Sequence, residues 1–223
     1  MKNKVLTTLY IISVAVLILT VSIALPIYFR PFYYMQIKPL ELEYYSGYTF
    51  EQIITAYNSV LNYLTIPFTK FSVGELTYSN DGYLHFKDCK ALFMLNFYAL
   101  IISLILVIIL LILNKKGKLT LIKFKGFSPA FYSSIIALLI PLILGTIAVI
   151  NFDVAFTLFH TILFPGKTNW YFDPYLDPII LILPEKFFMA CGILIAVLML
   201  TICLTIITVN LVKKYNLNKQ KTK

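Results

Sequence analysis

The chain has 223 residues, of which 60% are hydrophobic and 13% are charged, and its formal net charge is +9 at pH 7. A mean hydropathy of +0.84 excludes an ordinary soluble domain and places the chain among membrane proteins. The three cysteines fit no redox or zinc motif, so we expect no disulfide, no metal and no other cofactor.

Four continuous apolar runs dominate the sequence, and each reaches the ~20 residues that a helix needs to cross a bilayer. The runs lack the alternation of a membrane barrel, so we expect helices. The predicted fold class is an all-α membrane protein with four transmembrane helices, a small extracellular α+β cap (a short helix plus a β-hairpin) and an interfacial loop. The expected segments are a first transmembrane helix at 1–30, the extracellular cap at 31–91, a second transmembrane helix at 92–114, a cytoplasmic loop at 115–127, a third transmembrane helix at 128–150, an extracellular interfacial helix and loop at 151–186, a fourth transmembrane helix at 187–212 and a cytoplasmic tail at 213–223.

The lysines indicate which way the chain crosses the membrane. Both termini and the loop at 115–127 share one side, and together they carry twelve lysines and no acidic residue. The opposite side carries all ten acidic residues against seven basic ones. The positive-inside rule then places the termini in the cytoplasm and the two large loops outside the cell. The net charge follows from this topology, so we expect no nucleic-acid partner.

The first apolar run has the look of a signal peptide, because Lys2 and Lys4 precede it. The run is longer than the ~7–15 residues of a signal-peptide core, and Ser22-Ile23-Ala24 is a poor cleavage site. We therefore expect an uncleaved first span. Arg30 follows its outer end, where a long cationic side chain reaches headgroup phosphates.

Two elements are expected in the cap. Thr49 and Gln52 have the spacing of a capping box, and apolar residues recur after them at helical spacing as far as Pro67. Asp81-Gly82 lies between two runs that read as strands, so we expect a β-hairpin across residues 75–86. Its register stays open, because a longer loop beginning one residue earlier would shift every cross-strand pair.

The segment between the third and fourth spans concentrates residue types that functional sites use. Residues 156–188 hold one of the two histidines, the only tryptophan and four of the ten prolines. Just before it, Asp153 begins a polar stripe that continues through Thr157 to His160 and Thr161, which is typical of a helix lying at a membrane interface. An aromatic belt would account for the rings alone. Because exposed loops often carry function, we expect a belt that also houses a site.

His85 and His160 are the two histidines, and both lie at the membrane edge of the predicted outer loops. A neutral imidazole has an unperturbed pKa near neutrality, so a pair can act as general base and general acid without special tuning. The alternative for each is a purely structural role. Two histidines make only a weak metal site. The serine-hydrolase, zinc-protease and phosphate-loop motifs are absent from the chain.

Two outer segments carry a family resemblance. They are FSVGELTYSNDGYLHFKDCKALF before the second span and FHTILFPGKTNWYFDPYLDPIILILPEKFF before the fourth. Together with the four-span plan, they resemble the lipoprotein intramolecular transacylase (Lit) family of bacterial integral membrane proteins. The family pattern near the first histidine ends in Asp-Val-Lys. This chain has Asp88-Cys89-Lys90 there, which is a mild departure.

The resemblance implies a membrane acyltransferase whose substrate is a diacylglyceryl lipoprotein in membrane lipid. Such an enzyme moves the sn-2 acyl chain onto the α-amino group of the lipoprotein's N-terminal cysteine and leaves a lyso-form N-acyl lipoprotein. We expect His85 and His160 to be the catalytic proton-transfer pair, with their roles unassigned and no covalent intermediate. Donor and acceptor share one molecule, so the enzyme's main task is to orient it. The sequence indicates no oligomeric state.

Further residues are expected to bind substrate, and each has a plainer alternative. The aspartates are placed to orient an imidazole or meet the substrate ammonium, or else they only form turns before proline. The cations bind an ester carbonyl or a headgroup, or else they only extend toward the membrane surface. The aromatic rings line the pocket, or else they belong only to the belt. These substrate-binding candidates are Asp88, Lys90, Trp170, Tyr171, Asp173, Asp177, Tyr78 and Arg30.

Two other classes of protein compete with the acyltransferase. One is a non-enzymatic lipid-binding or transporter-accessory membrane protein, although the charges inside the spans that mark an ion path are missing. The other is an intramembrane hydrolase, which should show a serine beside a base or paired aspartates at membrane depth. The apolar runs show neither pattern.

Overall fold

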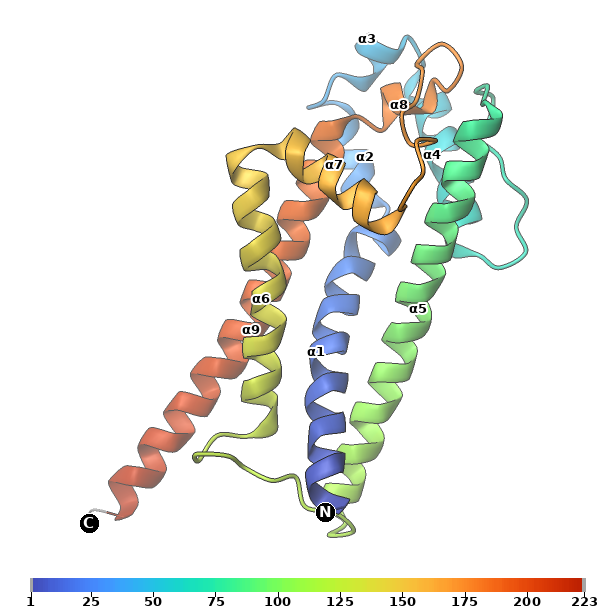
Figure 1. Ribbon diagram of the computed structural model, residues 1–223. Coiled ribbons are helices and arrows are strands. Elements are labelled where there is room, and N and C mark those ends of the chain that lie inside the picture. The colour runs from blue at the N-terminus through green and yellow to red at the C-terminus, as the bar shows by residue number, and fades with distance from the viewer. Residues whose placement is uncertain (1, 222–223) are drawn as a thin grey trace. The chain divides into compact units, whose positions relative to one another are not determined.

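The computed structural model describes residues 2–221, and its regular secondary structure over that range is helical (Figure 1). The helices are α1 Lys2–Tyr28, α2 Pro31–Ile37, α3 Leu42–Ser46, α4 Phe50–Thr65, α5 Asn80–Lys115, α6 Pro129–Ile150, α7 Phe152–Leu163, α8 Ile179–Ile182 and α9 Glu185–Lys221. Outside these helices, the described residues hold one isolated bridge, between Phe124 and Phe127.

Four helices of residues 2–221 are long and apolar enough to cross a membrane, namely α1, α5, α6 and α9. This confirms the predicted all-helical plan with four spans. Helix α6 begins at Pro129, where the missing N–H of proline leaves no hydrogen bond unmade. Helices α5 and α9 contain 36 and 37 residues, which is well beyond the ~20 needed to cross the hydrocarbon core. Each therefore extends past the membrane: α5 carries residues 80–91 before its apolar run, and α9 carries residues 213–221 after its own.

The predicted β-hairpin across residues 75–86 is wrong, because α5 already begins at Asn80. Ser79 caps this helix. Its hydroxyl oxygen accepts a hydrogen bond from the Gly82 N–H at 2.9 Å, and its carbonyl accepts one from the Tyr83 N–H at 3.1 Å. A serine side chain that satisfies the third N–H is the usual start of a helix.

The residues that looked like a hairpin turn form the first turn of α5. Asp81 lies in that turn, where the helix dipole favours a negative charge. The buried positions that follow are Gly82, His85 and Phe86, which are three and four residues apart and share one helical face. Burial of one helical face therefore outweighs the turn preference of Asp81-Gly82, and these residues form a helix.

Two helix predictions for the outer segments are confirmed. Helix α4 follows a complete capping box, in which the Thr49 hydroxyl accepts from the Gln52 N–H at 3.3 Å and the Gln52 side chain accepts from the Thr49 N–H at 3.0 Å. Helix α7 forms where the polar stripe predicted it and is capped by the side chain of Asn151. The position of α7 at a membrane interface stays a prediction.

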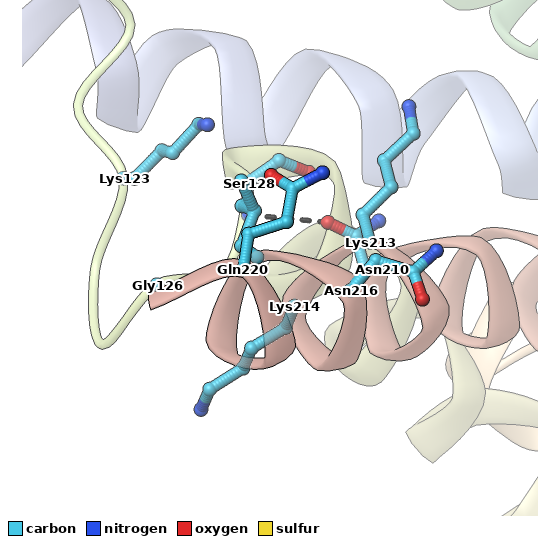
Figure 2. A pocket seen from close by; sticks show the side chains of 9 residues that line it. Lys123, Gly126, Ser128, Asn210, Lys213, Lys214, Asn216 and Gln220 are labelled. Carbon is cyan, nitrogen blue, oxygen red and sulfur yellow. Dashed lines mark hydrogen bonds between the residues drawn. The ribbon is translucent and has the colours of Figure 1, made fainter. Parts of the chain in front are cut away.

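The described residues fall into two compact units. The first comprises Met1–Ile23, Phe97–Thr146 and Ile195–Lys223. Its core is formed by apolar side chains of four helices, among them Tyr10, Val107, Ala137 and Met199. A pocket of about 420 Å³ in this unit is lined by Lys123, Gly126, Ser128, Asn210, Lys213, Lys214, Asn216, Leu217 and Gln220 (Figure 2). Most of the residues that line it are polar or basic, and neither histidine is among them.

The second unit comprises Ala24–Asn96 and Ile147–Leu194, and its core is aromatic. The ring of Tyr33 in α2 stacks on Tyr57 in α4 with centroids 3.8 Å apart, and Phe187 meets it edge-on at 5.1 Å. The Tyr33 hydroxyl donates to the carbonyl of Ile182 at 2.8 Å. This core joins α2 and α4 to α8 and the start of α9, and Phe86 adds α5, which carries His85.

One buried carboxylate links the start of α5 to the segment before α8. Asp177 is 3% exposed and accepts hydrogen bonds from the Ser79 N–H at 2.8 Å and the Ser79 hydroxyl at 2.6 Å. Gly82 lies directly against it, because a Cβ there would overlap the Asp177 Oδ1 and come within 2.8 Å of its Cγ. The contact requires glycine at position 82 for space.

Candidate active site

The second unit brings the two histidines together. His85 lies in the second turn of α5 and His160 in α7, and their ring centroids are 5.8 Å apart. Both are buried, with exposed fractions of 8% and 7%. Residues 75 positions apart in the sequence thus place two imidazoles within the reach of one small substrate group.

His160 has a defined tautomer. Its Nδ1 lies 2.8 Å from the carbonyl oxygen of Phe156, one helical turn earlier. A carbonyl can only accept, so Nδ1 carries the hydrogen and Nε2 is the basic nitrogen of the neutral ring. Burial lowers the pKa of His160, and the hydrogen bond to Phe156 opposes part of that shift. The ring is therefore neutral at pH 7 and ready to accept a proton.

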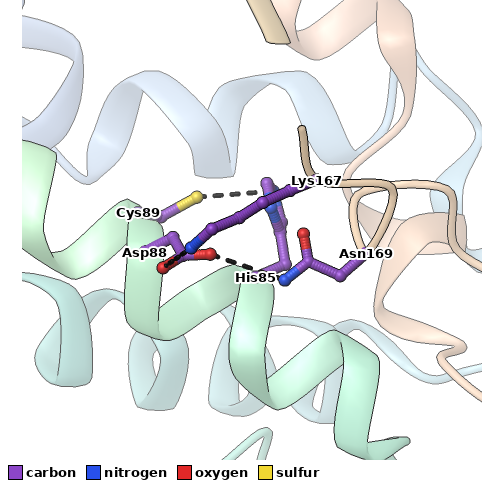
Figure 3. Close-up of polar contacts among 5 residues, drawn as sticks. All are labelled: His85, Asp88, Cys89, Lys167 and Asn169. Atoms are coloured by element: carbon purple, nitrogen blue, oxygen red, sulfur yellow. Dashed lines mark hydrogen bonds and ion pairs between the residues drawn. The ribbon is translucent and has the colours of Figure 1, made fainter. Parts of the chain in front are cut away.

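His85 is held differently. Its Nε2 lies 3.4 Å from the Sγ of Cys89, one turn further along α5 (Figure 3). Its Nδ1 is buried and has no hydrogen-bond partner among residues 2–221. A buried polar atom without a partner is costly, unless something else binds it. This nitrogen can therefore take a hydrogen-bond partner from outside the described chain.

Aromatic rings surround both imidazoles. Trp170 stacks on His160 with centroids 4.5 Å apart, and Phe164 and Phe172 meet His85 edge-on at 5.0 and 5.5 Å. Trp170 is fixed in turn, because its indole N–H donates to the carbonyl of Lys167 at 3.0 Å. The rings bury the imidazoles and limit the access of water.

Asp88 lies one turn after His85 and belongs to a small polar cluster (Figure 3). It forms an ion pair with Lys167 and accepts a hydrogen bond from the Asn169 side-chain nitrogen at 3.4 Å. The remaining oxygen of Asn169, its Oδ1, is buried and has no partner within the described residues. The cluster ties α5 to the loop that carries Trp170.

The other predicted substrate-binding residues make contacts with the protein itself. Asp177 binds Ser79, and Asp173 accepts from the Tyr175 N–H at 2.9 Å in a local turn. None of these contacts involves a histidine. The remaining predicted residues lie as follows: Lys90 donates to the carbonyls of Ile66 and Thr69, Arg30 donates to Asn58 and Asn62, Tyr78 meets Phe71 edge-on, and Tyr171 stacks on Trp170.

Several residues at the site were missed by sequence reasoning. Lys167 and Asn169 lie in the same loop as Trp170, and the motif around the tryptophan was the only signal for them. Phe164 and Phe172 looked like ordinary belt residues. No pattern in the chain distinguishes a ring that faces an imidazole from one that faces lipid.

Metal chemistry has no visible site in the part of the chain that the structure describes. Among those residues, no group of three or more His, Cys, Asp or Glu side chains is arranged to hold a metal ion. Nearby, Cys89 offers the only sulfur that contacts a histidine within residues 2–221.

Comparisons with known proteins identify the family. The family model described as lipoprotein intramolecular transacylase Lit matches residues 8–188. The in meso structure of the membrane-integral Lit from Bacillus cereus is 27% identical, with a TM-score of 0.83, and the match covers 100% of this chain and 99% of that one. No curated protein matches this chain.

Two further structures of Bacillus cereus Lit carry H85R and H85A mutations. Each is 25% identical to this chain with a TM-score of 0.77. The first match covers 99% of this chain and 94% of that one, and the second covers 100% and 96%. The family resemblance read from the sequence is thereby confirmed, and the non-enzymatic alternative is set aside. The chain belongs to the lipoprotein intramolecular transacylase family and is a multi-pass membrane acyltransferase.

Proposed function

We propose that this protein moves the sn-2 acyl chain of a diacylglyceryl lipoprotein onto the α-amino group of its N-terminal cysteine, with His85 and His160 as the acid–base pair. The observation that carries the proposal is the pair of buried imidazoles, with ring centroids 5.8 Å apart. Family membership gives the class of reaction. The two imidazoles offer the base and the acid that aminolysis of an ester needs.

The reaction balances within one substrate molecule and needs no co-reactant. The amine nitrogen attacks the carbonyl carbon of the ester, so a C–N bond forms and the C–O bond to the glyceryl oxygen breaks. The nitrogen loses one proton to a base, and the departing glyceryl oxygen gains one from an acid. No covalent enzyme intermediate is required, because amine and ester already share a molecule. Orienting them can contribute as much as ~7–11 kcal/mol of the barrier reduction.

His160 is assigned as the general base. The bond from its Nδ1 to Phe156 leaves Nε2 as the unprotonated nitrogen, and burial lowers its pKa, so the ring is neutral. Trp170 stacks on the ring and holds its orientation. Nε2 is therefore the nitrogen that takes the proton from the attacking amine.

His85 is assigned as the proton donor. The Cys89 thiol lies 3.4 Å from Nε2, and a protonated thiol donates weakly to an unprotonated ring nitrogen. Nδ1 then carries the hydrogen, and it is the nitrogen without a partner in residues 2–221. We assign the Nδ1–H to the ester oxygens, first as a hydrogen-bond donor and then as the acid that protonates the leaving glyceryl oxygen. The proton that His160 took from the amine then returns to His85, so both rings end neutral and the substrate has only exchanged its C–O bond for a C–N bond.

Asn169 is assigned to the substrate amine. Its Oδ1 is buried and accepts no hydrogen bond within the described residues, whereas its amide nitrogen donates to Asp88. An amine N–H is a suitable donor to this oxygen. The aromatic surround keeps water from competing with the amine for the ester, which favours transfer over hydrolysis.

The expected orientation places the termini in the cytoplasm and the histidine site on the extracellular side of the cell membrane. The support is the distribution of charge, because the twelve lysines of the terminal segments and the 115–127 loop have no acidic neighbour there.

The test is a purified enzyme in a lipid phase with a synthetic diacylglyceryl lipopeptide, followed by mass spectrometry of the product. The wild-type protein should convert it into an isomer of equal mass whose fragmentation places one acyl chain on the cysteine nitrogen. His85→Ala and His160→Ala should each reduce the rate by ~10²–10⁴-fold, the usual loss for an acid or base.

The matched control is Thr161→Ala, beside His160, because Thr161 is exposed and its hydroxyl bonds only within α7. This variant should keep most of the wild-type rate. If a folded single-histidine variant also kept it, the acid–base assignment would be wrong. If wild-type enzyme released mainly free fatty acid, the transfer assignment would be wrong instead.

A further inference from the structure

Arg30 lies outside the histidine site, in a contact network that a substrate without phosphate does not explain. It follows the end of α1 at Tyr28 by two positions and precedes Pro31, the first residue of α2. Its Nη1 donates to the Asn58 Oδ1 at 2.8 Å, and its Nη2 donates to the Asn62 Oδ1 at 2.6 Å. The Tyr34 hydroxyl donates to the same Asn58 oxygen at 2.8 Å. The guanidinium is therefore fixed in orientation.

The orientation of both asparagines follows from this contact. A guanidinium can only donate, so each amide turns its oxygen toward Arg30 and its nitrogen away from it. Asn58 and Asn62 are four residues apart on α4 and share one helical face. The Asn58 oxygen already accepts two hydrogen bonds, which uses both of its lone pairs. What the network still offers is donors: the unused guanidinium N–H groups and two amide NH₂ groups.

The positive charge of Arg30 is oriented but not neutralised. Its partners are neutral amides, and it forms no ion pair with a carboxylate of residues 2–221. Lys167, by contrast, is paired with Asp88, and Lys90 is held by two carbonyls and the ring of Tyr63. Arg30, Asn58 and Asn62 are only partly buried, so an external group can reach them. A donor-rich cation with open access is a site for an anion.

The place of Arg30 in the fold indicates which anion. It follows a helix that is long and apolar enough to cross a membrane, so its level is the boundary between hydrocarbon and water. Apolar side chains flank the network, because Phe29 is 46% exposed and Ile66, one turn after Asn62, is 48% exposed. The ligand that combines an anion with acyl chains at this level is a phospholipid. A guanidinium fork recognises the oxygens of a phosphodiester in the same bidentate way as those of a carboxylate.

We propose that Arg30, Asn58 and Asn62 form a binding site for the phosphodiester of a membrane phospholipid. The diacylglyceryl lipoprotein carries no phosphate on its lipid, so this site holds a structural or annular lipid rather than the substrate. The inference is independent of the acyl-transfer proposal, because no residue of the network contacts either histidine within the described chain.

The test measures lipid binding and does not use enzyme activity. Purified full-length protein in detergent is titrated with phosphatidylglycerol, with dioleoylglycerol, which lacks the phosphate, and with inorganic phosphate. Native mass spectrometry counts bound lipid, and thermal unfolding reports stabilisation. Wild-type protein should bind phosphatidylglycerol and be stabilised by it, whereas dioleoylglycerol should neither bind nor stabilise. Inorganic phosphate should fail to compete at millimolar concentration.

Three variants locate the binding. Arg30→Gln should weaken phosphatidylglycerol binding roughly ten- to a hundredfold, because it removes the charged hydrogen bonds. Asn62→Ala keeps the charge of Arg30 but removes one of the side chains that hold the guanidinium, so it should weaken phosphatidylglycerol binding severalfold. This variant tests the proposal if Arg30→Gln does not fold. The matched control is Lys38→Gln, which removes the same charge from an exposed side chain at the end of α2. Lys38→Gln should leave binding unchanged.

Several results would overturn the proposal. Equal binding of phosphatidylglycerol by wild type, Arg30→Gln and Asn62→Ala would show that the lipid sits elsewhere. Equal binding of dioleoylglycerol would remove the role of the phosphate. Competition by inorganic phosphate would assign the site to a free anion instead of a lipid.

Discussion

The effect of Gly82→Ala on the free energy of unfolding should be destabilising when Asp177 is present and stabilising when it is absent. The contact between Gly82 and Asp177 gives the magnitude. In wild type, an added Cβ overlaps the Asp177 Oδ1 and forces the carboxylate away from Ser79. That movement breaks two hydrogen bonds to a carboxylate, each worth about 1.5–3 kcal/mol. Alanine in a helix regains only about 1 kcal/mol over glycine. Gly82→Ala should therefore destabilise the wild-type protein by roughly 2–5 kcal/mol.

In an Asp177→Ala background the same substitution should be stabilising. The carboxylate that the new Cβ meets is then gone, and what remains is the helix preference for alanine, about 1 kcal/mol. Asp177→Ala itself should be destabilising, because the Ser79 donors lose their acceptor. The two substitutions are thus strongly non-additive, as expected for residues in contact.

The assay is reversible unfolding of the four proteins in detergent, by heat or by increasing SDS. Gly192→Ala is the matched control, because a Cβ at this other helical glycine meets nothing within 4 Å. It should be neutral or slightly stabilising. If Gly82→Ala destabilised both backgrounds equally, the cause would lie elsewhere than in the Asp177 contact. If Asp177→Ala kept full stability but lost substrate affinity, Asp177 would be a binding residue and not a structural one.

Four other predictions concern the site. The double variant His85→Ala, His160→Ala should be scarcely slower than the slower single variant, because residues acting as a unit are not additive; independent losses that multiplied would contradict the pair. Burial lowers the pKa of His160, so stability should stay level between pH 8 and about 6.5 and fall below that, since the unfolded chain then binds more protons than the folded one; a loss of stability with a midpoint above 6.5 would contradict this. Replacing all three cysteines by serine should preserve substantial activity, and a stoichiometric acyl-enzyme would refute direct transfer. A cysteine placed in 115–125 should resist an impermeant thiol reagent on intact cells while one near Lys167 reacts, and the reverse pattern would invert the proposed topology.

The sequence predicted the helices well where a run of apolar residues, or their repeat at helical spacing, was long enough to be unambiguous. The four apolar runs and the capping box at Thr49 are examples. The length of an apolar run and the two residues of a capping box can both be read from neighbouring positions in the sequence. The start of α5 was missed for the opposite reason. Asp81-Gly82 is a strong turn signal over two residues, and the competing helical face of Gly82, His85 and Phe86 is defined only by what packs on it.

The site could be predicted only in part. The two histidines stood out because there are no others, and topology alone put both in the outer segments. Their neighbours did not stand out, because Lys167, Asn169 and Phe164 are ordinary residues until the loop folds back on α5. The predicted aspartates illustrate the same limit: a carboxylate that solvates a loop and one that binds a distant serine look identical in sequence.

The polar contacts between α5 and the loop after α7 explain how residues that carry no imidazole can matter to the chemistry. Asp88 pairs with Lys167 and Asn169, and Asp177 binds Ser79, so two separate links fix the histidine-bearing end of α5 to this loop. The same loop carries Trp170, which stacks on His160. Loss of either set of contacts would allow one imidazole to move relative to the other. A misplacement of about 1 Å can lower the rate of a reaction that depends on orientation by roughly 10²-fold. These contacts therefore help to hold the two imidazoles at the distance and orientation that the reaction needs.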